Sequence, residues 1–141
     1  MYWIDERYKE EKETLMVDTG KQISYWLAGA KEDWDVAVKL VDDGRYRHGL
    51  FFAHLALEKA LKAHVCRHTN EIAPKIHGLV KLAEIADITL DKNQLRALAE
   101  MTSFNVEGRY PETLPIPPSK EKSKYYMERA EAVFKWLTSQ L

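Results

Sequence analysis

Two long amphipathic stretches separated by a single glycine turn constrain the fold of this chain more than any other feature. Between Gln22 and Asp43, apolar residues recur every three or four positions, as they do along one face of an α-helix. The same spacing returns from about Arg45 to His68, where further apolar residues widen the stripe, as is typical of the central helix of a bundle. Gly44 lies between the two stretches and suits the left-handed backbone that follows a helix end. The sequence therefore predicts two long helices in a bundle.

Shorter helical stretches follow, and no segment alternates as paired strands do. Helices are expected at about 78–86, from the N-cap Asp91 through Met101, and from the partial N-cap Ser119 to the end. Four prolines at 111–118 exclude a helix there and predict an extended arm. The expected fold class is all-α, an antiparallel up-and-down bundle with four to five main helices. Residues 1–20 are expected to form a helical N-terminal extension and residues 21–141 a single domain.

Composition restricts the function classes. The chain has 141 residues and a net charge of −1, so no overall positive field would attract nucleic acid or a membrane. A single cysteine, Cys66, excludes a disulfide network and a four-cysteine zinc site within one chain, and it is typical of a reducing cytoplasm. No apolar run reaches the ~18–20 residues of a membrane span, and the acidic start is unlike a signal peptide. No cofactor-binding motif occurs. We therefore expect a cytoplasmic protein without a membrane segment, metal or cofactor.

Positive charge is concentrated on the second long helix. It holds five Lys and Arg residues against Glu58 alone, together with four of the five histidines. Such a helix can bind the phosphates of RNA or of a nucleotide, or it can be a solvated face whose cations offset acidic neighbours. His64 and His68 share one helical face, but no further ligands accompany them, so no metal site is predicted. Arg47 and His54 lie about two turns apart, ~10.5 Å along the axis, which is too far for joint catalysis within one chain.

The segment 104–111 joins a helix to the proline-rich arm. At such a junction Arg109 can bind a phosphate and Tyr110 can stack on a base. The structural alternative is that Arg109 bonds the carbonyls at the helix end and that Tyr110 packs against the bundle. The sequence leaves both interpretations open.

Five features in this order resemble the HEPN family. They are Ala30-x-x-Asp33-Trp34, Asp43-Gly44-Arg45-Tyr46, the run FFAHLALEKALKA from Phe51 to Ala63, Pro74-x-x-His77-x-Leu79, and Asn105-x-Glu107-x-Arg109-Tyr110-Pro111. The resemblance extends from about Ser24 to Leu141. It implies an antiparallel helical bundle that forms a homodimer and binds nucleotide or RNA. It also implies a partner, a separately encoded minimal nucleotidyltransferase, in a toxin–antitoxin-like pair.

Many HEPN domains are RNases in which an Arg is followed, after four to six residues, by a catalytic His. At that spacing from Arg109 this chain has Leu114, Pro115 and Ile116. Cleavage without a metal relies on a positioned acid–base histidine, so we predict no catalytic residue.

The leading interpretation is therefore a non-catalytic HEPN protein that binds nucleotide or RNA phosphates. The predicted binding residues are Arg109, Tyr110, Lys59, Lys62 and His54. Two alternatives remain. One is an RNase toxin with an atypical active site that uses His54 or His77, and the other is a pure protein-interaction module.

Overall fold

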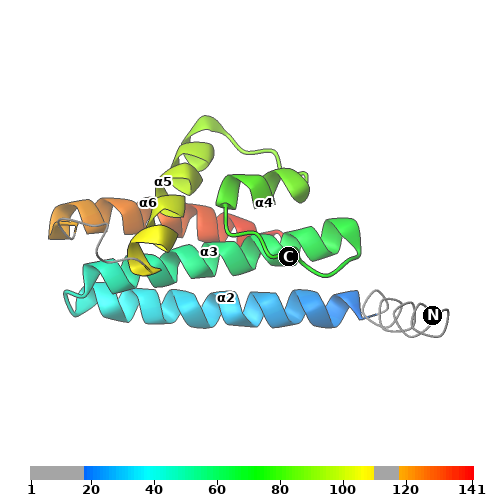
Figure 1. The fold of residues 1–141 in the computed structure, drawn as a ribbon, viewed down its shortest axis with the longest axis horizontal. Helices are drawn as coiled ribbons and strands as arrows, with labels where there is room; N and C mark the ends of the chain where they lie inside the picture. Colours follow the sequence, from blue (N-terminus) through cyan, green and yellow to red (C-terminus); the bar gives the residue numbers. More distant parts are fainter. Residues whose placement is uncertain (1–17, 110–117) are drawn as a thin grey trace.

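A computed structural model describes residues 18–109, except for the side chains of 106–109, and residues 118–141. These residues form five helices and no strand: α2 (Thr19–Asp42), α3 (Tyr46–Thr69), α4 (Leu79–Ile85), α5 (Lys92–Arg109) and α6 (Lys120–Ser139) (Figure 1). The predicted all-α class is confirmed. Residues 1–17 of the predicted extension and most of the proline-rich arm lie outside the described residues. Within the described ranges, no helix is long and apolar enough to cross a bilayer.

Helix α3 is the centre of the bundle. It runs antiparallel to α2 on one side, and α4, α5 and α6 also pack against it (Figure 1). Its wide apolar arc explains this position, because a helix with several apolar faces must be covered on several sides. Gly49 lets α2 approach closely, since a Cβ there would lie 2.4 Å from Cγ2 of Val41.

Local sequence signals fix the helix ends. Gly44 has φ +80° and turns the chain between α2 and α3, as predicted. Asp91 caps α5 by accepting a hydrogen bond from the amide of Gln94 (2.7 Å), and Gln94 Oε1 accepts one from the amide of Asp91 (3.0 Å). This reciprocal pair is a capping box. Ser119 accepts a hydrogen bond from the amide of Lys122 (3.1 Å), so it caps α6 as predicted.

Aromatic contacts hold the outer helices to the core. Trp34 of α2 stacks on Phe134 of α6 with ring centroids 4.9 Å apart, and Phe104 of α5 meets Tyr126 of α6 edge to face at 5.1 Å. Helix α5 extends past the predicted end at Met101 to Arg109. These contacts join α2 and α5 to α6, and all three helices pack against α3.

Candidate functional site

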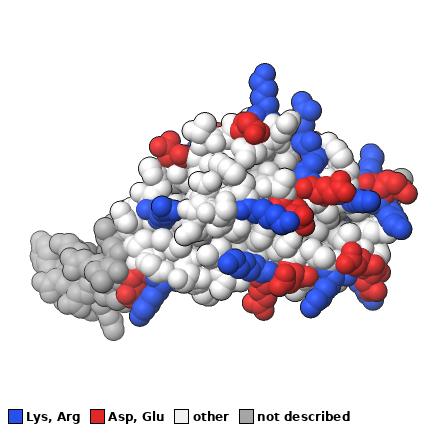
Figure 2. All heavy atoms as spheres, turned by 180° about the vertical axis from the view of Figure 1, so that it is seen from behind, with Lys and Arg blue, Asp and Glu red and all other residues white. Residues whose placement is uncertain are grey.

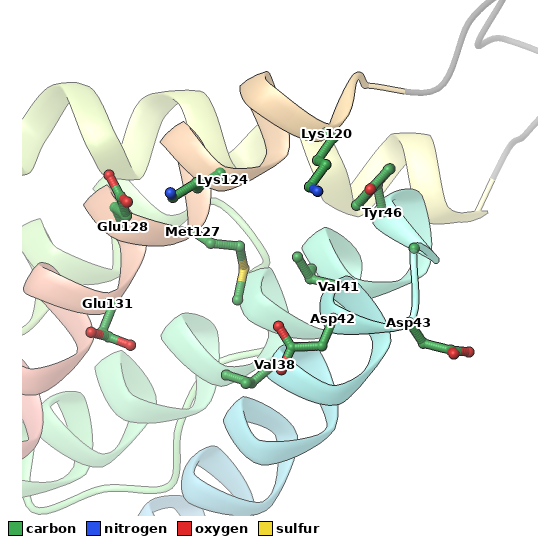
Figure 3. A pocket seen from close by; sticks show the side chains of 11 residues that line it. Val38, Val41, Asp42, Asp43, Tyr46, Lys120, Lys124, Met127, Glu128 and Glu131 are labelled. Atoms are coloured by element: carbon green, nitrogen blue, oxygen red, sulfur yellow. The ribbon is translucent and has the colours of Figure 1, made fainter.

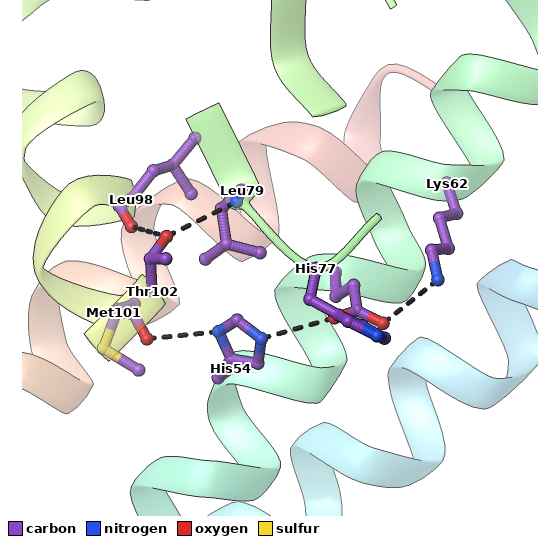
Figure 4. A network of polar contacts seen from close by, with 8 residues as sticks. His54, Lys62, His77, Leu79, Leu98, Met101 and Thr102 are labelled. Atoms are coloured by element: carbon purple, nitrogen blue, oxygen red, sulfur yellow. Dashed lines mark hydrogen bonds and ion pairs between the residues drawn. The ribbon is translucent and has the colours of Figure 1, made fainter. Parts of the chain in front are cut away.

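A buried row of ionisable side chains lies along one face of α3. His54, Glu58 and Lys62 are spaced by four residues, so their side chains follow one another along the helix. His54 Nε2 lies 3.3 Å from Glu58 Oε1, and Lys62 Nζ donates to Glu58 Oε2 at 3.2 Å (Figure 4). All three residues are buried. Ionisable groups are rarely buried without partners, and here each partners the next.

His77, from the connection between α3 and α4, brings this row to the surface. Its Nδ1 lies 3.0 Å from Glu58 Oε1, and its side chain is 45% exposed. The connection is held close by, because the amide of Leu79 donates to Oγ1 of Thr102 on α5 (3.4 Å; Figure 4). Among the described residues, His77 Nε2 has no hydrogen-bond partner. We call His54, Glu58, Lys62 and His77 the Glu58 cluster.

Both ring nitrogens of His54 face oxygen atoms that accept hydrogen bonds. Nδ1 faces the backbone carbonyl of Met101 on α5 at 3.1 Å, and a carbonyl can only accept a hydrogen bond. Nε2 faces Glu58, and an ionised carboxylate can also only accept. A neutral histidine has one donor nitrogen and could satisfy one of these contacts. Only a histidine with two ring protons could donate to both oxygen atoms.

Glu58 stays ionised well into the acid range. Burial alone would raise the pKa of this carboxyl, but the hydrogen bond from His54, the charge of Lys62 and the hydrogen bond from His77 outweigh burial and lower the pKa to about 2. Lys62 and Glu58 form a buried ion pair that the two histidines extend. The Glu58 cluster is therefore a buried polar network with an exposed edge at His77.

Helix α2 contributes to the surroundings of the cluster. The ammonium group of Lys62 lies 5.2 Å from the ring centroid of Trp26, a cation–π distance. The neighbouring Lys59 forms an ion pair with Asp33 (Nζ to Oδ2, 2.7 Å). Its alkyl chain crosses α2 at Gly29, where a Cβ would lie 3.2 Å from Lys59 Cδ. Lys59 is thus neutralised by α2, whereas Lys62 shares its carboxylate with two histidines.

The structure brings together only part of the predicted site. His54 and Lys62 meet at Glu58, while Lys59 is directed to α2. Arg109 is the last residue of α5, eight residues beyond Met101, or ~12 Å along the helix axis. Tyr110 lies outside the described residues. His54 is fully buried, and its ring contacts Glu58 and Met101 instead of the surface.

Two members of the cluster, Glu58 and His77, are absent from the predicted binding residues. Glu58 could have been found from the sequence, because it lies four residues from both His54 and Lys62. His77 lies 19 residues from Glu58, beyond the end of α3, and no helical spacing connects them. Only the path of the α3–α4 connection places it there.

A cleft of about 770 Å³ between the α2–α3 turn and α6 lies apart from the cluster (Figure 3). Its apolar lining includes Val38, Val41 and Met127, and four acidic and two basic side chains surround it. Lys59, Lys62 and His54, the predicted binding residues whose side chains the structure describes, do not line it.

His64 of α3 has a different partner. His64 Nε2 donates to the carbonyl of Leu137 (2.8 Å), and Arg67 donates to the carbonyl of Gln140, so both cap the end of α6. Burial lowers the pKa of His64. The hydrogen bond to Leu137 raises this pKa, and the nearby charge of Arg67 lowers it further, so the net shift is downward. In the described parts of the chain, no three His, Cys, Asp or Glu side chains are placed to hold a metal ion.

The arrangement of α2–α6 defines an all-α helical bundle of known type. The HEPN domain matches residues 23–140, and the chain belongs to the HEPN family. Its fold is similar to that in the crystal structure of TT1696 from Thermus thermophilus (TM-score 0.72, 20% identity, 85% of this chain and 98% of that chain). It is also similar to ST0689, an archaeal HEPN homologue (TM-score 0.65, 18% identity, 84% and 96%). No curated protein matches the sequence significantly.

Proposed function

We propose that this HEPN protein is a non-catalytic binder of nucleotide or RNA phosphates and that the Glu58 cluster is part of its binding site. The observation that supports the proposal is that three nitrogen-bearing side chains face one carboxylate. Glu58 faces nitrogen atoms of His54, Lys62 and His77, and the last of these is 45% exposed. If His54 carries both ring protons, the cluster has one positive charge in excess, and such a positive centre of low solvent exposure attracts anions more strongly than a solvated lysine does.

Each predicted binding residue has a place in this proposal. Lys62 supplies positive charge, and His54 holds Glu58 in position. Lys59 supports the same face of the bundle through Asp33. Arg109 ends α5 and Tyr110 follows it in the sequence, and the two are proposed to extend the site by binding a phosphate and stacking on a base.

A binding titration with adenosine monophosphate and with a short oligoribonucleotide tests the proposal. We expect both ligands to raise the melting temperature, because a ligand that binds only the folded state stabilises it. Arg109→Ala should weaken binding about 10–100-fold, from the loss of a charge-assisted hydrogen bond worth about 1.5–3 kcal/mol. Arg96→Ala, an exposed arginine of the same helix, is the matched control and should bind as the parent does.

Two results would contradict this assignment. If Arg109→Ala binds as tightly as the parent, the end of α5 is not part of the site. If neither ligand changes the melting temperature of the parent, the protein is better described as a pure protein-interaction module.

The partners implied by the HEPN resemblance form a further part of the proposal. We expect a homodimer in the cytoplasm that binds a separately encoded minimal nucleotidyltransferase as one half of a toxin–antitoxin-like pair. Light scattering after size-exclusion chromatography tests the dimer. Co-purification with a nucleotidyltransferase encoded beside this chain tests the pair, and separate elution of the two proteins would contradict it.

A second candidate function, RNA cleavage at an atypical site, is favoured by the contact between His77 and Glu58. A carboxylate bonded to Nδ1 orients an imidazole and leaves Nε2 available for proton transfer. If this function is correct, the parent cleaves RNA in the presence of EDTA with a bell-shaped pH dependence. His77→Gln should then abolish cleavage, whereas His68→Gln, a change at another exposed histidine, should not. Intact RNA in the parent reaction would exclude this candidate.

A further inference from the structure

We propose that the connection between α3 and α4, residues 70–78, is a strap that opens locally from the bundle, and that the contact between His77 and Glu58 is its latch. The strap lies against the buried ion pair of Glu58 and Lys62, so its opening admits water to this pair. The inference concerns a movement of the chain. It therefore goes beyond the proposed function and is independent of phosphate binding.

Burial distinguishes the ion pair beneath the strap from charges at the surface. Figure 2 shows Lys and Arg side chains next to Asp and Glu side chains across one face, where water hydrates them. By contrast, the side chains of Lys62 and Glu58 are 8% and 6% exposed. Trp26 of α2 lies 5.2 Å from the ammonium group of Lys62, and His77 of the strap lies 3.0 Å from the carboxylate of Glu58 (Figure 4). The strap therefore contributes one of two covers of this pair.

Few hydrogen bonds hold the strap closed. Between Asn70, the left-handed residue that ends α3, and the start of α4, no amide donates to a backbone carbonyl of the described residues. Pro74 has no amide proton, and the amide of Glu71 donates to Oγ1 of Thr69 (3.2 Å). Ile72 is apolar and exposed. Segments with few hydrogen bonds and exposed apolar groups open at a low free energy while the rest of the fold stays closed.

Three contacts oppose the opening, and only the one at His77 has a charged partner. Because Glu58 is ionised, its Oε1 accepts a hydrogen bond from Nδ1 of His77. The amide of Ala73 donates to the thiol of Cys66, a weak acceptor, and Ile76 packs against the edge of the core. Hydrogen bonds to charged groups stabilise more than those between neutral groups. Loss of the His77 side chain should therefore favour the open strap.

Cys66 reports on the strap, because it is the only cysteine of the chain and contacts the backbone of Ala73. It is buried, and burial raises the pKa of its thiol, an effect that hydrogen bonds such as the one from Ala73 only partly offset. The thiolate is the form that attacks a disulfide reagent. With dithiobis(nitrobenzoate), it forms a mixed disulfide and releases one thionitrobenzoate, whose absorbance gives the rate. This rate measures the population of the open strap.

The test compares this rate in the parent, in His77→Ala and in the matched control His68→Ala. Both histidines are exposed, so neither change should unfold the bundle. We expect His77→Ala to react about tenfold faster, as the loss of one hydrogen bond to a charged group predicts, and His68→Ala to react as the parent does. Urea well below the unfolding midpoint should leave the rates unchanged, since local opening exposes little surface.

Ser119→Ala separates the opening of the strap from unfolding of the whole bundle. This variant loses the N-cap of α6 and lowers global stability without changing the strap, so Cys66 should react at the parent rate. Equal rates in His77→Ala and the parent would overturn the latch. A faster reaction in Ser119→Ala, or a rate that rises steeply with urea, would show that Cys66 reacts through global unfolding and would overturn the strap. Nucleotide titrations decide the phosphate-binding proposal separately.

Discussion

Replacement of Glu58 by glutamine removes the one negative charge of the cluster while preserving the size of the side chain. Lys62 would then remain buried without a counter-ion, and His54 would lose its carboxylate partner. The lowering of the Glu58 pKa from 4.5 to about 2 corresponds to about 3 kcal/mol of stability at neutral pH. Breaking one side of a buried ion pair costs about 3–5 kcal/mol, which agrees with this figure. We therefore expect Glu58→Gln to lose about 3 kcal/mol, or about 10 °C in melting temperature.

Urea denaturation of the parent and of Glu58→Gln at pH 7, followed by circular dichroism, measures this difference. Glu84→Gln is the matched control, because Glu84 is exposed and its loss should cost less than about 0.5 kcal/mol. Acid gives a second readout with a defined sign. Since the pKa of Glu58 is lower in the folded state, its contribution is present above pH 4.5 and is lost as the pH falls towards 2. A loss below about 1 kcal/mol, or an acid midpoint that Glu58→Gln does not change, would refute the reasoning.

Three further changes test the packing of α2 on α3, the N-cap of α6, and the buried contact of His64 with the end of α6. Gly49→Ala should destabilise the protein by about 1–3 kcal/mol in the same assay, because the added Cβ would lie 2.4 Å from Val41 Cγ2. Unchanged stability would mean that α2 and α3 can move apart at little cost. Ser119→Ala should cost about 1 kcal/mol by removing the N-cap of α6, and Ser119→Thr should recover most of it. The lowered pKa of His64 predicts that stability falls as the pH drops below 6.5, and a parallel pH profile in His64→Gln would contradict this.

The sequence predicted the helices well because their signals are local. Apolar spacing located α2 and α3, and single residues such as Gly44 and Ser119 marked helix ends. The end of α5 was placed too early, at Met101 instead of Arg109. Beyond Met101 the helix is stabilised by tertiary contacts such as Phe104 with Tyr126, which no local pattern reports.

The candidate site was predicted less completely, because burial depends on the packing of several helices. Charge counting along α3 suggested an exposed basic face, but His54 and Lys62 are buried against Glu58 once α2 and α5 are in place. Lys59 and Lys62 are three residues apart and have different partners, Asp33 and Glu58. The sequence supplies the residue types, and the crossing of the helices decides which of them meet.

The protonation state of His54 is the most direct test of the positive centre on which the proposed function depends. A long-range ¹H–¹⁵N correlation spectrum of the histidine side chains at pH 7, with His54 assigned by comparison with His54→Gln, reports both ring nitrogens separately. We predict that Nδ1 and Nε2 of His54 are both protonated, because Met101 and Glu58 each present only an acceptor. One protonated and one bare nitrogen would show that His54 is neutral, which would leave the cluster without its charge excess and contradict the account.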